Sequence, residues 1–259
     1  MTYIIAEAGI NHNGQMPIVR EMIDAAKQAG ADCIKFQLYH TSRLTSEPKT
    51  GVRLRDEIIQ KRVKAKGHLK QCELTKENVS AIMDMCAKSE IDFLATPFDC
   101  QWADIMMGLG CREFKVGSDR IFDVQLMDLL YQYANTLYVS LGMAQGIDIE
   151  RLLSNSFLEG VDSLVLMHCV SKYPTPPEEA DMKKIRRLQV RFGNEVGVGF
   201  SDHTTDIHAG ACAVINGATY LEKHFTLDHK MKGPDQKMSF TPDELKTYIA
   251  LARGVEVYK

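Results

Sequence analysis

The chain alternates short β-like runs with longer segments of helical periodicity, and this alternation restricts the possible folds more than any other feature of the sequence. Eight strands are expected, at residues 3–8, 33–38, 92–95, 113–116, 137–140, 163–168, 196–199 and 219–222. Neighbouring parallel strands need a crossover connection, which is usually a helix. The alternation therefore predicts a parallel sheet, and eight strands are the number that closes a TIM-type barrel.

The segments between the strands have the pattern of helices that cover a sheet. Eight helices are expected, at residues 16–29, 76–88, 101–108, 124–133, 146–154, 180–191, 206–216 and 242–253. In the first of these, apolar residues at positions 18, 19, 22, 23, 25 and 26 form a one-sided stripe. We predict an α/β protein whose residues 1–259 form a single domain, a TIM (β/α)8 barrel. A doubly wound open sheet is the alternative architecture.

Composition and charge argue against several classes of protein. The net charge of −3 disfavours a nucleic-acid binder, which normally carries a basic surplus. No apolar run approaches the ~18 residues of a membrane span, and the N-terminus lacks the pattern of a signal peptide. The 7 cysteines include no C-x-x-C pair, as expected of buried, reduced thiols. We therefore expect a cytoplasmic protein without a nucleic-acid or membrane partner.

One segment, residues 39–71, is longer than the usual connection between elements. It is rich in basic residues, namely Arg53, Arg55, Lys61, Arg62, Lys64, Lys66 and Lys70. Two interpretations fit this composition. The segment is either a solvated charged face or a mobile lid that closes over an anionic substrate.

Polar residues gather at the C-terminal ends of the expected strands, where barrels of this kind build their active sites. They include Glu7, Lys35, Gln37, Thr96, Lys115, Ser118, Ser140, Ser171, Tyr173 and Ser201. Lys35 and Lys115 would bring two positive charges into one cavity lined by short hydroxyls. Such a set suits a phosphate, or a ligand with both phosphate and carboxylate. An ion pair of either lysine with Glu7 or Glu222 is the competing explanation.

Two histidines, His203 and His224, follow the seventh and eighth expected strands. Imidazoles that converge from neighbouring strands can bind a divalent transition metal and leave positions open for substrate or water. Asp235 follows on the next loop and could orient a metal-bound water. A purely structural role for the histidines remains equally possible on this pattern alone. His12, His168, His208 and His229 are weaker candidates for ligands.

Motifs along nearly the whole chain resemble those of the sialic acid synthase (N-acetylneuraminate synthase, NeuB-like) family. The matching segments are AEAGINHNG at 6–14, GADCIKFQ at 30–37, ATPFD at 95–99, FKVGS at 114–118, SLGMA at 140–144, YPTPP at 173–177, GFSDHT at 199–204, EKHFT at 222–226 and GPD at 233–235. They occur in the order in which the family has them. Chance does not account for a match of this extent.

The resemblance implies a barrel that condenses phosphoenolpyruvate with an N-acetylmannosamine-type (acetamido-hexose) aldehyde, giving a nine-carbon 2-keto-3-deoxy acid and phosphate. It implies a divalent metal, Mn²⁺ or Mg²⁺, on His203 and His224. The phosphoenolpyruvate-binding positions of the family match Lys35, Thr96, Lys115, Ser118, Ser140 and Ser201. Positions that contact the acceptor or the metal-bound water match Glu7, Gln37, Tyr173 and Asp235. We expect Glu7, Lys35, Lys115 and Asp235 to be catalytic.

The sequence departs from the family pattern in three places. Ser171 stands where an asparagine often contacts phosphoenolpyruvate, and Leu141 where threonine is common. The family usually continues into a C-terminal antifreeze-like domain, whereas this sequence ends at Lys259, just after the eighth expected helix. We expect the barrel without that domain, in a homo-oligomer and most simply a dimer.

Two further functions stay open. A related phosphoenolpyruvate-dependent synthase could use another aldose or an aldose phosphate. A catalytically idle, sugar-binding barrel could serve as a scaffold or sensor, although the retained lysines, histidines and Asp235 favour an enzyme.

Overall fold

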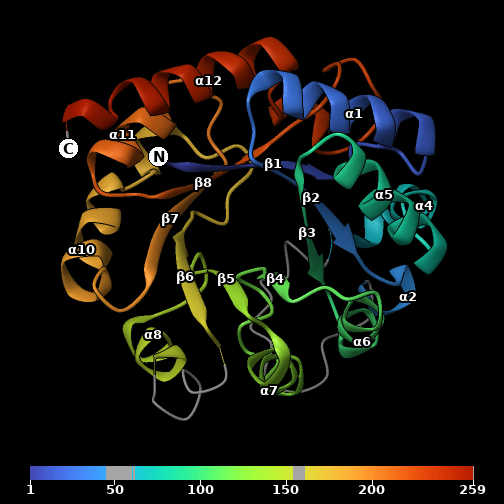
Figure 1. Cartoon of the computed structure of the whole chain (residues 1–259), viewed down its shortest axis with the longest axis horizontal. Helices are drawn as coiled ribbons and strands as arrows, with labels where there is room; N and C mark the ends of the chain where they lie inside the picture. The colour runs from blue at the N-terminus through green and yellow to red at the C-terminus, as the bar shows by residue number, and fades with distance from the viewer. Residues whose placement is uncertain (45–59, 61, 154–160, 259) are drawn as a thin grey trace.

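The computed structural model describes residues 1–44, 60, 62–153 and 161–258. Its strands are β1 Tyr3–Gly9, β2 Cys33–Leu38, β3 Asp92–Pro97, β4 Glu113–Val116, β5 Thr136–Ser140, β6 Ser163–His168, β7 Gly197–Asp202 and β8 Tyr220–His224. All pair in parallel, in the order β3-β2-β1-β8-β7-β6-β5-β4. The two end strands, β3 and β4, also lie next to each other, so the sheet curves into a nearly closed barrel (Figure 1). The predicted TIM barrel is confirmed.

Helices surround this barrel on the outside (Figure 1). Their bounds are α1 Met16–Ala29, α2 Thr41–Leu44, α4 Lys66–Gln71, α5 Lys76–Lys88, α6 Cys100–Gly108, α7 Val124–Tyr133, α8 Gly146–Leu152, α10 Met182–Phe192, α11 Ala209–Ile215 and α12 Pro242–Gly254. Three 3₁₀ turns occupy η1 Pro177–Glu179, η2 Gln236–Met238 and η3 Glu256–Tyr258. Gly30 ends α1 with φ 95°, and Thr75 and Asn78 form a capping box at α5.

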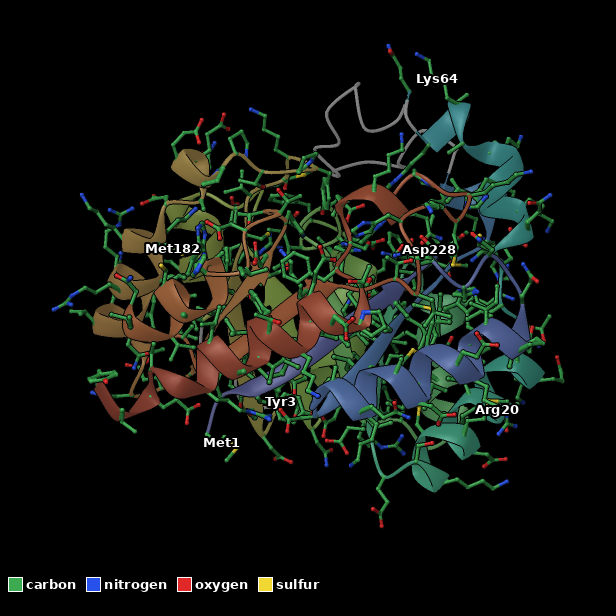
Figure 2. The ribbon with its side chains drawn as sticks, turned by 90° about the horizontal axis from the view of Figure 1, so that it is seen from above. Met1, Tyr3, Arg20, Lys64, Met182 and Asp228 are labelled. Carbon is green, nitrogen blue, oxygen red and sulfur yellow. The ribbon has the colours of Figure 1, made fainter. Side chains whose placement is uncertain are left out.

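Side chains along each strand alternate between the helices and the barrel interior. Outward residues such as Ile4, Phe36 and Leu221 join the main core beneath the helices. Inward residues fill the barrel from its N-terminal end with Ile5, Cys33, Leu94, Tyr138, Val165 and Met167. This apolar plug closes one end, so the polar residues further along the strands face a single mouth. Figure 2 shows Met1 at one end of the barrel and Lys64 at the other, the end of the mouth.

The predicted boundaries differ from the structure mainly at the mouth. β7 runs to Asp202 and β8 to His224, beyond the predicted ends at residues 199 and 222. The pairing of β7 with β8 continues there because inward polar side chains form hydrogen bonds with one another. Ser201, for example, donates to its register partner Glu222. The helix predicted at 206–216 begins later, at Ala209, because the Asp206 carboxylate accepts the backbone N–H of His208 in a turn.

In the described residues, the segment predicted as irregular, residues 39–71, includes the short helices α2 and α4. They form because Leu44 and Leu69 pack with Ile10, Tyr39 and Cys72 in a small separate cluster. Arg53, Arg55 and Lys61 lie outside the described residues, as does Ser154 at the end of a predicted helix. Within the described ranges, no helix is long and apolar enough to cross a membrane.

Candidate active site

Four charged side chains meet at the centre of the barrel mouth. Glu7 on β1, Lys35 on β2, Lys115 on β4 and Glu222 on β8 all point inward and are at most 5% exposed. Lys35 Nζ lies 2.9 Å from Glu7 Oε2 and 3.6 Å from Glu222 Oε2. Lys115 Nζ lies 3.7 Å from the same Glu222 oxygen. Glu222 thus holds the two lysines together, and the ion pairs offered as the competing explanation for them are present.

The pKa values of these groups reflect burial and mutual attraction. Burial opposes ionisation of Glu222, but Lys115 and Lys35 outweigh it and lower its pKa to about 2. Burial raises the pKa of Glu7, and Lys35 only partly offsets this. Burial lowers the pKa of Lys115, whereas Glu222 and Glu7 overcome burial at Lys35 and raise its pKa. Lys35 and Glu222 are therefore held in their charged forms.

Three of the four central charges also have a hydroxyl beside them. Lys35 Nζ donates to Thr96 Oγ1 at 3.2 Å, and Lys115 Nζ donates to Ser140 Oγ at 2.5 Å. Ser201 Oγ donates to Glu222 Oε1 at 2.8 Å. A hydroxyl that accepts from a lysine keeps its own O–H for another acceptor. Thr96 and Ser140 can therefore donate to an anion that enters between the lysines.

The rim of the mouth is more exposed and carries the remaining predicted residues. Ser118 and Ser171, on the loops after β4 and β6, lie 3.2 Å apart through their Oγ atoms. Gln37 Nε2 donates to Glu7 Oε1 at 2.9 Å. Gly9, at φ 53°, keeps this pair free of a side chain, since a Cβ there would lie 3.3 Å from Glu7 Oε1 and 3.4 Å from Gln37 Nε2.

The two histidines lie side by side at the ends of β7 and β8. Their ring centroids are 5.8 Å apart, and the Tyr173 ring lies 4.1 Å from His203 and 6.0 Å from His224. His203 Nδ1 donates to the Val170 carbonyl at 2.7 Å, which leaves Nε2 as the nitrogen with a lone pair. Burial lowers the pKa of His203 to about 4 and that of His224 well below its usual value, so both rings are neutral at pH 7.

This pair has features that fit a metal site. Neutral imidazoles are the form that binds metals, and a backbone carbonyl that orients the second ring nitrogen is the usual support. In the described residues, Nδ1 of the buried His224 has no hydrogen-bond partner. No group of three or more His, Cys, Asp or Glu side chains in the described part of the chain could hold a metal by itself. A metal at His203 and His224 would therefore need ligands from substrate or water, as a catalytic site does.

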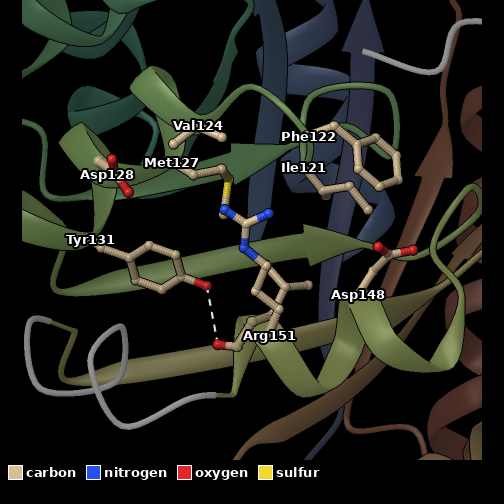
Figure 3. Close-up of a pocket in the computed structure, with 9 residues that line it drawn as sticks. Ile121, Phe122, Val124, Met127, Asp128, Tyr131, Asp148 and Arg151 are labelled. Atoms are coloured by element: carbon tan, nitrogen blue, oxygen red, sulfur yellow. Dashed lines mark hydrogen bonds between the residues drawn. The ribbon is translucent and has the colours of Figure 1, made fainter. Parts of the chain in front are cut away.

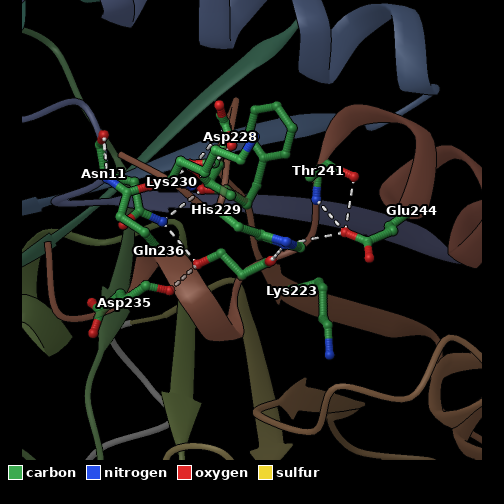
Figure 4. Close-up of polar contacts among 12 residues, drawn as sticks. Asn11, Lys223, Asp228, His229, Lys230, Asp235, Gln236, Thr241 and Glu244 are labelled. Carbon is green, nitrogen blue, oxygen red and sulfur yellow. Dashed lines mark hydrogen bonds and ion pairs between the residues drawn. The ribbon is translucent and has the colours of Figure 1, made fainter. Parts of the chain in front are cut away.

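Asp235 lies on the loop that follows β8, and a buried network holds that loop (Figure 4). Asn11 Nδ2 donates to the Phe225 carbonyl and to Ser239 Oγ, both at 2.8 Å. Ser239 Oγ in turn donates to the Asp235 carbonyl at 2.7 Å. Gln236 Nε2 donates to the Asn11 carbonyl at 3.0 Å. Burial, with a smaller contribution from Glu7, raises the pKa of the Asp235 carboxyl to about 6.

The structure brings together most of the predicted site residues and separates others from them. His168 ends β6 but points outward, where it bonds the Ala180 carbonyl at 2.7 Å and stacks on Phe200. His208 is exposed beside Asp206. Glu222 was expected as a possible ion-pair partner of either lysine, and it contacts both. The sequence signal for Glu222 is its position two residues before His224 on the same strand, which turns both side chains to the inside of the barrel.

A shallow pocket lies away from the mouth, between α7 and α8 (Figure 3). Ile121, Phe122, Val124, Met127, Tyr131 and Leu152 form its apolar lining, beside Asp128, Asp148 and Arg151. Tyr131 Oη donates to the Leu152 carbonyl at its edge. None of the predicted site residues lines this pocket, so we assign the chemistry to the mouth.

Comparison with known proteins identifies the family. The model of the NeuB family matches residues 22–258. The N,N'-diacetyllegionaminic acid synthase of Campylobacter jejuni is 33% identical over 98% of this chain and 76% of its own length. The N-acetylneuraminate-9-phosphate synthase of Drosophila melanogaster is 35% identical over 99% of this chain and 68% of its own.

A solved structure agrees with these matches in three dimensions. The N-acetylneuraminic acid synthetase of Leptospira borgpetersenii superposes with a TM-score of 0.87 at 29% identity, over 99% of this chain and 84% of the other. The family model covers most of the sequence, and the similarity in fold extends along the same residues. The chain therefore belongs to the NeuB family.

Proposed function

We propose that the chain condenses phosphoenolpyruvate with an acetamido-hexose aldehyde of the N-acetylmannosamine type, forming a nine-carbon 2-keto-3-deoxy acid and phosphate. One observation carries the proposal. A two-lysine, multi-hydroxyl anion site shares the barrel mouth with a pair of neutral histidines. Such a mouth suits one anionic and one aldehyde substrate together. Membership of a family that contains legionaminic and neuraminic acid synthases supports the same reaction.

The reaction joins two molecules and consumes water. C3 of phosphoenolpyruvate forms a bond to the aldehyde carbon, whose oxygen takes up a proton. Water adds at C2, and the bond between C2 and the phosphate oxygen breaks, so that the keto acid and phosphate leave. Atoms and charges balance without an oxidant or reductant.

Lys35 and Lys115 bind the phosphate and carboxylate of phosphoenolpyruvate in this proposal. Their charges would stabilise the negative charge that passes to the leaving phosphate. The hydroxyls of Thr96, Ser118, Ser140, Ser171 and Ser201 donate to the same anion. The entering anion would replace part of the stabilisation that Glu222 and Glu7 give the lysines.

Glu7, Gln37, Tyr173 and Asp235 face the acceptor sugar and the attacking water. Gln37 and Glu7 already form one hydrogen-bonded pair at the rim, which offers both a donor and an acceptor to sugar hydroxyls. Asp235, with its pKa near 6, is ionised at pH 7 and can act as a general base that takes a proton from the water as it attacks C2.

His203 and His224 hold the divalent metal, Mn²⁺ or Mg²⁺, in this proposal. When bound, the metal polarises the aldehyde carbonyl toward attack. The neutral rings suit this role because no proton has to leave before the metal binds. We further propose that the protein is cytoplasmic and acts as a homo-oligomer.

Phosphate release from phosphoenolpyruvate, measured across a panel of acetamido-hexoses and aldose phosphates with and without EDTA, tests the proposal. We expect release with at least one unphosphorylated acetamido-hexose and none after EDTA. Release only with aldose phosphates would identify another member of the same reaction class. Uptake of Mn²⁺ without phosphate release from any acceptor would contradict the proposal and favour an idle sugar-binding barrel.

A further inference from the structure

A second ion pair lies directly behind the proposed metal site, on the outer face of the same two strands. Asp202 on β7 and Lys223 on β8 are register partners. Their inward neighbours are Ser201 and Glu222, whereas the pair itself points toward α11 and α12. Lys223 Nζ lies 3.0 Å from Asp202 Oδ2, and both side chains are at most 1% exposed. The Lys223 ammonium also lies 4.0 Å from the centroid of the Phe240 ring.

The contacts of this pair enclose His203. Asp202 Oδ1 accepts the backbone N–H of Thr204 at 2.8 Å, so the two residues that flank His203 are tied together. Lys223 Nζ donates to the Thr204 carbonyl at 2.5 Å as well as to Asp202. Lys223 is itself flanked in the chain by Glu222 and His224. One buried ammonium therefore connects the backbone on either side of His203 to the strand end that bears His224.

Stability alone does not account for such a pair. Removing two charges from water is expensive, and an apolar pair of similar volume often stabilises a fold equally well or better. A buried pair with every hydrogen bond formed does fix geometry, because neither partner can move without leaving a charge unpaired. The geometry fixed here is the separation of the β7 and β8 ends.

We propose that Asp202 and Lys223 are positioning residues that set the distance and orientation of His203 and His224, and so the affinity of the mouth for a divalent metal. This inference rests on the proposed function, since it assumes that the two histidines hold the metal. Neither residue touches substrate or metal. Supporting residues of this kind typically change metal affinity by about 10–100-fold when they are replaced.

Calorimetric titration of the whole chain with Mn²⁺ alone tests the inference without relying on turnover. The informative variant is the double replacement Asp202→Leu with Lys223→Met, which removes both charges and leaves no buried charge unpaired. We expect it to keep a wild-type circular dichroism spectrum and to bind Mn²⁺ at least ~10-fold more weakly. A folded double variant with wild-type Mn²⁺ affinity would overturn the inference. If the double variant does not fold, Asp202→Asn, which keeps the shape, decides the matter by the same criterion.

A matched control uses a different ion pair, Asp32 with Arg253, at the other end of the barrel. Arg253 Nη2 on α12 lies 2.8 Å from Asp32 Oδ2, and its Nη1 donates to the Gly30 carbonyl at 3.1 Å. Asp32→Leu with Arg253→Met should leave Mn²⁺ affinity unchanged, whatever it does to the melting temperature. An equal loss of affinity in this control would mean that ion pairs in this barrel support metal binding through general stability, and would count against a positioning role.

The titration of His203→Ala separates the two proposals. This variant should lose Mn²⁺ binding if the metal site is correct. If His203→Ala binds Mn²⁺ as well as the wild type does, the metal part of the proposed function fails and the inference falls with it. If His203→Ala loses Mn²⁺ and the folded Asp202 and Lys223 variants do not, only the inference falls.

Discussion

At the scale of single residues, the mouth is built on one carboxylate that two lysines share. Glu222 contacts Lys35 at 3.6 Å and Lys115 at 3.7 Å, so its single negative charge is divided between two cations. Lys35 has Glu7 as a second partner, whereas Lys115 has only Glu222 and the Ser140 hydroxyl among the described contacts. Lys115 is therefore the cation more easily turned toward an entering anion.

Replacing Lys115 with alanine should weaken phosphoenolpyruvate binding far more than acceptor binding. Truncating a buried, hydrogen-bonded charge costs about 2 kcal/mol or more, which corresponds to an increase of ~30-fold in KM for phosphoenolpyruvate. The KM for the acceptor should change by no more than ~3-fold on the same argument. Steady-state kinetics with each substrate varied in turn measures both constants.

The exposed Lys172, which pairs with Glu179 at the surface near the same rim, is the matched control. Lys172→Ala should leave both constants close to the wild-type values, because an exposed pair contributes little. An equal rise of both constants in Lys115→Ala would contradict the proposed role of this lysine.

Asp235 makes a prediction about pH. Its pKa is raised to about 6, so the carboxylate that the proposed mechanism needs is lost as the pH falls through 6. We expect kcat/KM to decline below pH 6 in the wild type. In Asp235→Asn, activity should be lower throughout and this acidic limb should disappear. Asp228→Asn, on the same loop but exposed, should keep the wild-type profile.

The raised pKa of Asp235 should also make the free energy of unfolding depend on pH, with a definite sign. A carboxyl whose pKa is raised on folding destabilises the folded state as the pH rises from about 4 to about 6. Asp235→Asn should therefore be more stable than the wild type at pH 7, by about 1 kcal/mol after allowance for its partial exposure, and equal to it at pH 4. Urea unfolding at the two pH values measures this. A variant less stable at pH 7 than at pH 4, relative to the wild type, would contradict the assignment.

At the scale of elements, most of the fold was predictable because its signals are local. Strand and helix periodicity is written into short windows, and caps such as Gly30 and Thr75 mark the ends of helices. The two short helices α2 and α4 were not predictable. Their stabilisation comes from packing of Leu44 and Leu69 on Tyr39 and Ile10, and no local pattern records such contacts.

The site was predictable in its members and less so in its geometry. Alternation along the strands correctly groups Lys35, Lys115, Ser201 and the two histidines in one mouth. His168 was grouped with the residues of the mouth but points outward, because it lies one position out of phase with the inward Met167; Asp202 and Lys223 point outward for the same reason. The sequence could not reveal that Glu222 bridges both lysines, because that contact joins β2, β4 and β8 across the barrel.

The contact between α11 and α12 makes a prediction about two glycines. A Cβ on Gly210 in α11 would lie 2.4 Å from the Tyr248 ring of α12, whereas a Cβ on Gly108 in α6 would meet nothing within 4 Å. Gly210→Ala should destabilise the fold by about 1–3 kcal/mol through overpacking. Gly108→Ala should stabilise it by up to about 1 kcal/mol, because alanine loses less entropy in a helix.

Thermal and urea unfolding of both variants checks the opposite signs. The pair serves as its own control, since the same substitution is made in two helices of one barrel. Two changes of the same sign would mean that the close approach of α11 to α12 is not as the structure has it.

At the scale of the whole molecule, the barrel separates stability from chemistry along its axis. An apolar plug that includes Ile5, Leu94 and Met167 closes the N-terminal half, and every proposed catalytic group lies in the other half. In the proposed function two substrates enter this one mouth, with the anion over the β2 and β4 side and the aldehyde toward β7 and β8. Relatives of the same family are named for different sugar acids.

The central claim is that metal held by His203 and His224 and the anion site around Lys35 and Lys115 act together in one condensation. Phosphate release and keto-acid formation, followed in one reaction mixture with the active acceptor, test it most directly. We predict equal amounts of both products, complete loss after EDTA, recovery on adding Mn²⁺, and a loss of at least ~100-fold in His203→Ala and His224→Ala with the fold intact. Full turnover by either histidine variant after chelation, or phosphate release without a keto acid, would contradict the account.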